Sequence, residues 1–144
     1  MSNGVPKEAR EIMDMCFGCD SLIALATVDG ETPYVRTVDA YYEDDSFYVI
    51  TNALSGKMQQ ISKKPTVAIC GEWFTAHGTG ENMGHILLPE NAEIASKLRA
   101  AFAEWYDNGH INEADTNTCI LRIRLTDGVL FSHGTRYDID FTGK

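Results

Sequence analysis

The chain has few of the features that mark membrane, secreted or nucleic-acid-binding proteins. No apolar run in the 144-residue sequence approaches the length of about 18 residues that a membrane helix needs. The N-terminus is polar and contains no apolar signal core, so we expect a cytoplasmic protein. Lysine and arginine number 12 against 21 acidic residues, for a net charge of -9. This charge argues against nucleic acid or an anionic membrane as the main partner.

Cysteine is also scarce, and its spacing does not indicate a strong metal or redox motif. Cys16 and Cys19 have the CxxC spacing. The pair follows a predicted helix and precedes a predicted strand, whereas a redox motif opens a helix, and a zinc site needs a second pair of ligands. Gly18 is interpreted as the cap of that helix. Cys70 and Cys119 lie in apolar runs and are predicted to be core residues.

The four histidines do not form a metal motif, because no pair has the HxxxH spacing of a helical site. We therefore predict no metal site. His77 and His85 flank a glycine-rich segment, which leaves haem ligation open as an alternative.

What the chain does contain is a series of short apolar segments separated by turn residues. Its length suits one domain, and we predict a single domain over residues 1–144. Residues 6–17, 55–63 and 89–106 have helical periodicity. Strands are predicted over residues 21–28, 34–42, 47–51, 66–70, 73–79, 118–125 and 129–132, with an edge strand near 137–141.

Turn signals join these strands into hairpins. Asp29 and Gly30 are typical of a tight turn, as are residues 43–46, and Asp127 and Gly128 are interpreted as a last turn. Most of the connections are too short for parallel crossovers. The sequence therefore predicts a mainly β fold with flanking helices, in which antiparallel strands form a barrel rather than an open sheet.

One segment carries a candidate binding site. Residues 48–65 predict a strand, a short turn and a helix that ends at Pro65. Ser55 and Lys57 stand at the start of that helix, where free N–H groups and the helix dipole favour an anion. Arg36, one strand earlier, reaches the same place if the two strands pair. We predict a phosphate pocket for a small cofactor; the alternative is a surface pair of Arg36 with Asp39 or Glu43.

The order of these motifs resembles the FMN-binding split-barrel family that includes pyridoxamine 5'-phosphate oxidase. The motifs are LATVDG at 25–30, PYVRTV at 33–38, FYVITN at 47–52, SGK at 55–57, ISKKP at 61–65 and LRIRLTDGVLFSHGTR at 121–136. The resemblance implies a six-stranded antiparallel split β-barrel of Greek-key type. It also implies a homodimer that binds FMN at the interface between its subunits.

The resemblance further implies which residues bind the cofactor. The strand arginine and the Ser-x-Lys segment hold the phosphate, and the backbone beside Thr51 lies along the flavin ring. Trp73, five residues before Gly78, matches a position that reaches the flavin of the other subunit. The implied cofactor-binding residues are Arg36, Thr37, Val38, Ile50, Thr51, Ser55, Lys57 and Trp73.

One motif of the family is missing. Pyridoxamine 5'-phosphate oxidases carry an Arg-x-His substrate motif near the C-terminus, whereas this chain has SHGTRY at 132–137. We therefore expect an FMN-dependent oxidoreductase with NAD(P)H as donor, acting on a small molecule other than pyridoxamine 5'-phosphate. The alternatives are a flavin- or haem-binding stress or sensor protein without turnover, a deazaflavin protein, or a structural cytosolic domain without a cofactor.

Overall fold

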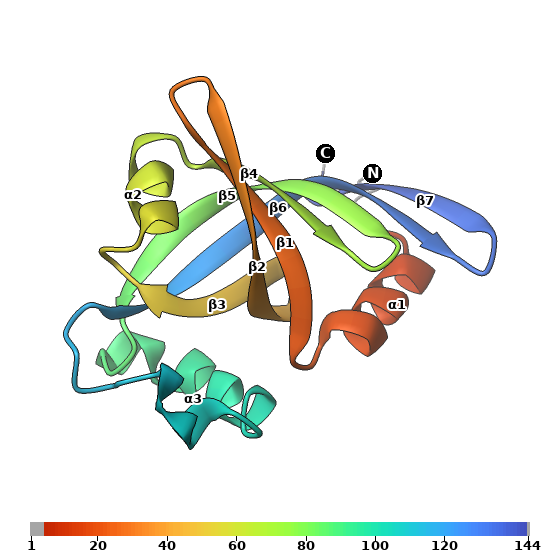
Figure 1. The fold of residues 1–144 in the computed structure, drawn as a ribbon. Coiled ribbons are helices and arrows are strands. Elements are labelled where there is room, and N and C mark those ends of the chain that lie inside the picture. Colours follow the sequence, from red (N-terminus) through yellow and green to blue (C-terminus); the bar gives the residue numbers. More distant parts are fainter. Residues whose placement is uncertain (1–4, 144) are drawn as a thin grey trace.

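Antiparallel strands form one sheet that closes into a barrel (Figure 1). The computed structural model describes residues 5–143. The sheet has the order β3-β2-β1-β4-β5-β6-β7, and pairing of β3 with β6 closes six strands while β7 stays at the edge. The strands are β1 Ser21–Asp29, β2 Thr32–Glu43, β3 Ser46–Asn52, β4 Thr66–Gly71, β5 Phe74–His85, β6 Thr118–Ser132 and β7 Thr135–Asp140.

The predicted fold class is confirmed, including its Greek-key connection. After the β1-β2-β3 meander the chain crosses through α2 (Gly56–Lys63) and returns as β4 beside β1. The predicted domain over residues 1–144 extends past the described part, because residues 1–4 and 144 lie outside it.

Two short turns in the meander agree with the sequence. Gly30 has φ 63° in the β1–β2 turn, and Asp44 and Asp45 have φ 55° and 65° in the β2–β3 turn. In the β2–β3 turn both central residues have positive φ, which is the signature of a tight hairpin turn that matches strand twist. These turns set the β2–β3 register, in which Glu43 pairs with Ser46.

The last predicted hairpin is wrong. Asp127 and Gly128 do not form a turn, because β6 runs without interruption through both residues and turns only before β7. Gly128 instead allows β5 to approach closely: a Cβ there would lie 3.0 Å from the Phe74 ring and 3.1 Å from the Thr75 carbonyl oxygen. The real turn contains His133 and Gly134, both with positive φ, and β7 is the predicted edge strand.

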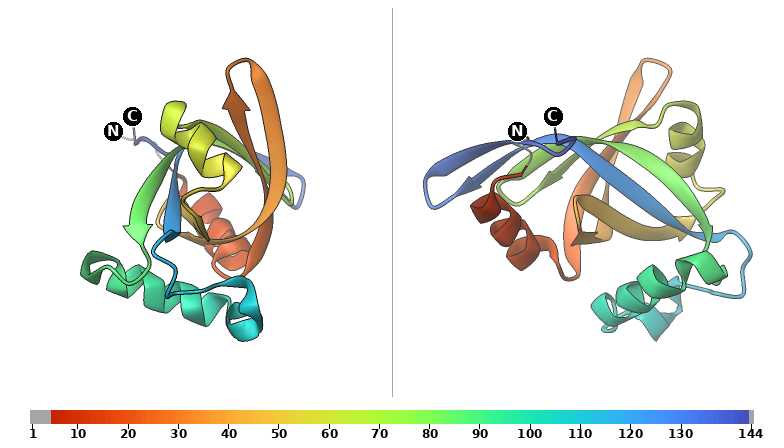
Figure 2. Two further views of the ribbon diagram at one scale, coloured as in Figure 1. Left: turned by 60° about the vertical axis from the view of Figure 1, so that its left-hand side comes forward. Right: turned by 180° about the vertical axis from the view of Figure 1, so that it is seen from behind.

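The helices lie at separate places around the barrel (Figure 2). Helix α1 (Lys7–Phe17) and α2 agree with the prediction to within a residue. The helix predicted over residues 89–106 is shorter, because it divides into the turn η1 (Pro89–Asn91), α3 (Ala92–Ala101) and the irregular turn η2 (Tyr106–His110). Tertiary contacts explain the break: Phe102 is buried, and the Trp105 indole donates a hydrogen bond to Asp20.

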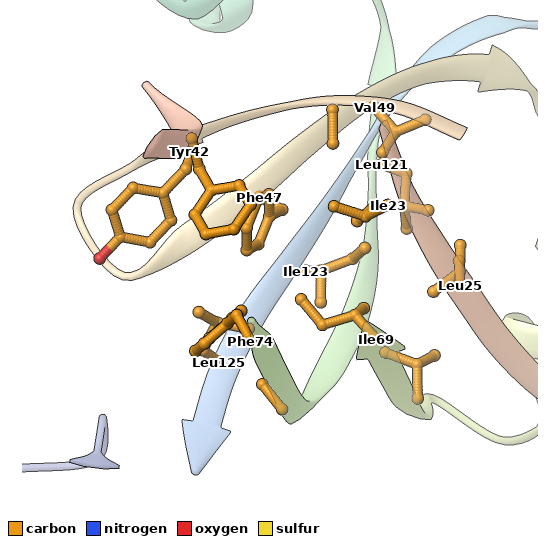
Figure 3. Packing of buried hydrophobic residues seen from close by; sticks show 14 of the residues in the cluster. Ile23, Leu25, Tyr42, Phe47, Val49, Ile69, Phe74, Leu121, Ile123 and Leu125 are labelled. Carbon is orange, nitrogen blue, oxygen red and sulfur yellow. The ribbon is translucent and has the colours of Figure 1, made fainter. Parts of the chain in front are cut away.

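The barrel interior is filled by aliphatic and aromatic side chains (Figure 3). Phe47 lies at its centre, with ring centroids 5.3 Å from Tyr42 and 5.6 Å from Phe17 of α1. A second cluster packs α3 and η2 against the outside of the barrel, through Leu98, Phe102 and other residues. Cys119 is buried as predicted, but Cys70 is exposed and is not a core residue. The second cluster includes Trp105, Tyr106 and Ile111, and so holds η2 against the barrel. Residues of this segment line a cavity described below.

No helix in the described residues 5–143 is both long and apolar enough to span a membrane.

Candidate functional site

The start of α2 presents a buried hydroxyl without a partner. Ser55 precedes the helix in extended conformation, with φ -66° and ψ 159°, and its side chain does not cap the helix. Its Oγ is buried and has no hydrogen-bond partner among the described residues. The free N–H groups of a first helical turn lie at the same end. Ser55 is therefore not the simple N-cap that its position suggests, and its hydroxyl is available to a ligand.

Lys57 brings a positive charge to this end of the helix. Its ammonium lies 2.8 Å from Thr51 Oγ1 at the end of β3 and donates a hydrogen bond to it. An ammonium has three donors, so this bond leaves two for a ligand. Burial, and after it the positive charge of Arg36, lower the pKa of Lys57. The two cations are thus close enough to act on one another, as the predicted phosphate pocket requires.

Arg36 is held in place by neutral groups. Its Nη1 lies 2.7 Å from Thr27 Oγ1 and 3.3 Å from the Leu25 carbonyl oxygen, and its Nη2 lies 3.3 Å from Gln60 Oε1 of α2. Thr27 in turn donates to Gln60. The alternative of a surface ion pair with a strand carboxylate is not seen. Because its bonded partners carry no charge, Arg36 keeps its full positive charge available to an anion.

These residues fit a phosphate group. Ser55 and Lys57 stand at the start of α2, and the charge of Arg36 acts on Lys57. Cations, hydroxyls and helix N-termini are the groups that recognise phosphate oxygens. Gly56 adds space, since nothing lies within 4 Å of a Cβ placed there. Thr27 and Gln60, which orient Arg36, were not predicted from the sequence, because nothing in their spacing indicates their contact with residue 36.

A cavity of about 360 Å³ adjoins this site. It contains Lys57, and its walls include two more predicted residues, Val38 and Ile50. In Figure 1, α2 lies on one side of β3 and α3 on the other. Val49 and Ile50 of β3 line the cavity. The full lining is Val38, Asp39, Val49, Ile50, Lys57, Trp105, Asn108, His110 and Ile111.

Two predicted residues lie elsewhere. Thr37 is exposed and is not among the residues that line the Lys57 cavity. Trp73 is 71% exposed in the β4–β5 turn, with φ 60°. It lines a separate cavity of about 620 Å³ next to α1 and the β6–β7 turn. Within one chain neither residue reaches the Lys57 cavity, so their role stays a prediction about a second subunit.

The sequence did not indicate the acidic side of the Lys57 cavity. Asp39 lines it, and His110 and Trp105 enter from η2 and the residue before it. Trp105 Nε1 lies 2.8 Å from Asp20 Oδ2. Burial, followed by the hydrogen bond and charge of Asp20, raises the pKa of Asp39 to about 6, while His110 lowers it. The one sequence signal for this role of Asp39 is that an acidic residue stands inside a predicted strand of Val, Ala and Tyr residues.

The histidines considered for haem are engaged elsewhere. His85 Nε2 lies 3.0 Å from two carbonyl oxygens, of Glu113 and Asp115, and its Nδ1 accepts the Leu87 N–H. Both ring nitrogens of His85 are therefore in use. His77 is exposed and lies 2.9 Å from Asp127. Within residues 5–143, no group of three or more His, Cys, Asp or Glu residues is placed to hold a metal ion.

No protein-family model and no curated protein matches this chain. Solved structures do match. The fold is similar to a provisionally assigned pyridoxamine 5'-phosphate oxidase from Listeria innocua, with 11% identity and TM-score 0.64 over 86% of this chain and 95% of that chain. A FAD-binding protein from Mesorhizobium loti has 14% identity and TM-score 0.65, over 82% and 90%. A haem-binding protein from Mycobacterium smegmatis has 13% identity and TM-score 0.65, over 86% and 54%.

These identities are low and establish the fold. The chain adopts the split barrel that its motifs predicted, a fold that flavin- and haem-binding proteins share. What this chain binds has to be argued from its own residues.

Proposed function

We propose that this protein is a flavin-dependent oxidoreductase that binds FMN by its phosphate at Arg36, Ser55 and Lys57. The observation that carries the proposal is the unpartnered buried hydroxyl of Ser55 at the start of α2, two residues before Lys57, on which the charge of Arg36 acts. The ring then has part of the cavity lined by Val38 and Ile50 available to it. FMN supplies the hydride chemistry when bound, and the chain supplies position and electrostatics.

Reduced nicotinamide is the proposed electron donor, and a small molecule other than pyridoxamine 5'-phosphate is the proposed acceptor. Hydride steps at a flavin need no catalytic dyad from the protein, which agrees with the absence of such a motif from the sequence. We propose a cytoplasmic location for this activity.

Titration with FMN tests the phosphate site directly. Cofactor-free protein is titrated and binding is followed by quenching of FMN fluorescence, for wild type and for Lys57→Ala. Loss of a hydrogen bond to a charged group should weaken binding by roughly 10- to 100-fold. Lys63→Ala is the matched control, because Lys63 is an exposed lysine of the same helix. Equal affinities for Lys57→Ala and Lys63→Ala would refute the site.

An anaerobic titration separates an enzyme from a flavin carrier. FMN-loaded protein is mixed with NADH or NADPH under exclusion of oxygen. Bleaching of the flavin absorbance within seconds to minutes supports the oxidoreductase. A flavin band that stays unchanged supports the carrier without turnover, and a Soret band in freshly purified protein supports haem. The engaged nitrogens of His85 and the surface ion pair of His77 do not favour haem.

A homodimer completes the proposal. The outer face of β1, β2 and β4 carries small and apolar side chains in two rows, since Ala24 pairs with Thr37 and Cys70, and Ala26 pairs with Val35 and Ala68. Val35 is 68% exposed. We propose that a second copy of the chain covers this face in an isologous contact. Thr37 then lies at the interface, and Trp73 contacts the flavin bound by the other subunit.

A further inference from the structure

The cavity that contains Lys57 also holds an acidic side chain with no role in binding phosphate. Asp39 lies two residues before Tyr41, whose side chain packs with the cluster under α3. Because side chains alternate along a strand, Asp39 shares this outer face of β2. His110 and Trp105 line the same cavity from the covering segment. The Asp39 carboxyl is therefore partly covered by the segment that follows α3.

Burial raises the pKa of the Asp39 carboxyl, and Asp20 acts on this carboxyl and raises its pKa further. Asp20 Oδ2 accepts from the Trp105 indole at 2.8 Å, whereas Asp20 Oδ1 is buried and has no partner among the described residues. Ionised carboxylates only accept hydrogen bonds, so a hydrogen bond between Asp39 and Asp20 needs a proton on one of the two acids. A proton on Asp39 supplies the donor that Asp20 otherwise lacks.

The charges around the pair set when that proton is held. Burial and the neighbouring Asp20 raise the pKa of Asp39, and a positive charge on His110 opposes them. Lys57, on α2, is the other charged group that lines the cavity. Two neighbouring carboxyls cannot both ionise without repulsion. Asp39 can therefore hold its proton up to about pH 6 and release it within the cavity.

We propose that Asp39 is the proton donor to the acceptor that is reduced in this cavity. The inference rests on the proposed function. The acceptor gains a hydride, with its two electrons, from the reduced flavin at one atom, and a proton from Asp39 at the other. Asp39 is left as a carboxylate beside Asp20 and regains its proton from water. The flavin is oxidised, and reduced nicotinamide restores it.

The lining of the cavity limits the class of acceptor. Four of its nine lining residues are aliphatic and one is a tryptophan, and the polar groups stand at Asp39, Lys57, Asn108 and His110. This suits a small conjugated acceptor whose reduction places a proton on oxygen or nitrogen, as in a quinone. Without the acid such a product would leave the cavity as an anion, which an apolar site disfavours. Proton donation by a positioned acid typically accelerates a reaction about 100- to 10,000-fold.

The first test does not depend on turnover. In FMN-free protein labelled with ¹³C at aspartate carboxyls, the Asp39 signal should titrate near pH 6, and the Asp20 signal should move in the same step. In Asp39→Asn the amide still donates to Asp20 but cannot release a proton, so the step near pH 6 should vanish. Asp44→Asn, in the β2–β3 turn outside the cavity, is the control and should leave the step unchanged.

The second test measures the proton transfer. FMN-loaded protein is reduced without oxygen and mixed with menadione, and the return of flavin absorbance is followed from pH 5 to 8. The wild-type rate should fall about tenfold per pH unit above the Asp39 step. Asp39→Asn should be at least about 100-fold slower at pH 5 and independent of pH, with FMN affinity unchanged within about twofold.

The outcomes separate the two proposals. Failure of wild type to bind FMN ends the proposed function and this inference with it. If FMN binds but the Asp39→Asn rate and profile match those of wild type, or wild type does not reduce menadione, the inference alone is wrong. An Asp39 carboxyl that titrates near its ordinary value, without movement of Asp20, also overturns it.

Discussion

At the scale of single residues, Ser55 distinguishes a binding site from a structural cap. A capping serine stabilises its helix, and its replacement by alanine costs about 1 kcal/mol. The Ser55 hydroxyl is buried without a partner and does not cap α2. We predict that Ser55→Ala leaves the free energy of unfolding of FMN-free protein unchanged or raises it by up to about 1 kcal/mol. FMN affinity should fall roughly tenfold, because the FMN phosphate loses its hydrogen bond with the Ser55 hydroxyl.

Urea unfolding and FMN titration of the same variant check this prediction. A loss of stability without FMN, together with unchanged affinity, would return Ser55 to the role of a cap.

Asp39 gives a second prediction at this scale, for the dependence of stability on pH. The folded protein raises the pKa of Asp39 to about 6, first through burial and then through Asp20. Between pH about 4 and 6 the unfolded chain therefore binds fewer protons at this residue than the folded one, so stability falls as pH rises. Relative to wild type, Asp39→Asn should become more stable by roughly 1 kcal/mol over this range, an amount reduced for partial exposure.

Thermal unfolding of the two proteins from pH 3.5 to 7.5 measures the difference. Below the unfolded pKa the gap between them should stop changing. A gap that stays constant across the whole range would show that Asp39 has an ordinary pKa.

At the scale of elements, Gly128 tests why β6 continues where a turn was predicted. A Cβ at this position would lie 3.0 to 3.2 Å from Phe74, Thr75 and Ala76 of β5. We predict that Gly128→Ala lowers the free energy of unfolding by about 1 to 3 kcal/mol through overpacking. The matched control is Gly56→Ala, where the Cβ meets nothing and less freedom is lost on folding. Urea denaturation that shows equal stability for both variants would contradict the close approach.

The elements also show what a sequence can and cannot indicate. The α2 start and the β1–β2 and β2–β3 turns follow from local chemistry, and the structure has them where the residues predict. The Asp127–Gly128 pair has the same local signal as Asp29–Gly30, but a long-range contact with β5 makes it part of a strand. Local preference was overridden there by packing.

The residues of the candidate site also fall into two groups, those that local sequence indicates and those that only the fold brings together. Ser55 and Lys57 were predictable because they share one helix start, and Arg36 because its motif stands one strand earlier. Thr27, Gln60 and Asp20 were not, since each acts through a partner brought near only by the folded barrel. Trp105 and Asp20 are 85 residues apart in sequence. No sequence motif relates two residues that are so far apart in the chain.

At the scale of the whole molecule, assembly and cofactor binding should be coupled. The outer face of β1, β2 and β4 is the surface that the proposed dimer buries. Val35 is an apolar residue of this face that is 68% exposed, and Thr37 of the same face is exposed as well. A lysine at position 35 would place a charge in an apolar contact on both sides of a two-fold axis. We predict that Val35→Lys is a folded monomer and that its FMN affinity falls at least about tenfold, because Trp73 and Thr37 of a second chain no longer enclose the ring.

Leu87→Lys is the control, because Leu87 is also an exposed large apolar residue, at 53%, but lies outside that face. Size-exclusion chromatography with light scattering, recorded at flavin and protein wavelengths, gives mass and cofactor content together. Circular dichroism establishes that both variants are folded. A Val35→Lys monomer that retains FMN as tightly as wild type would show that one chain holds the cofactor alone. The site at Arg36, Ser55 and Lys57 would survive that result, whereas the roles given to Trp73 and Thr37 would not.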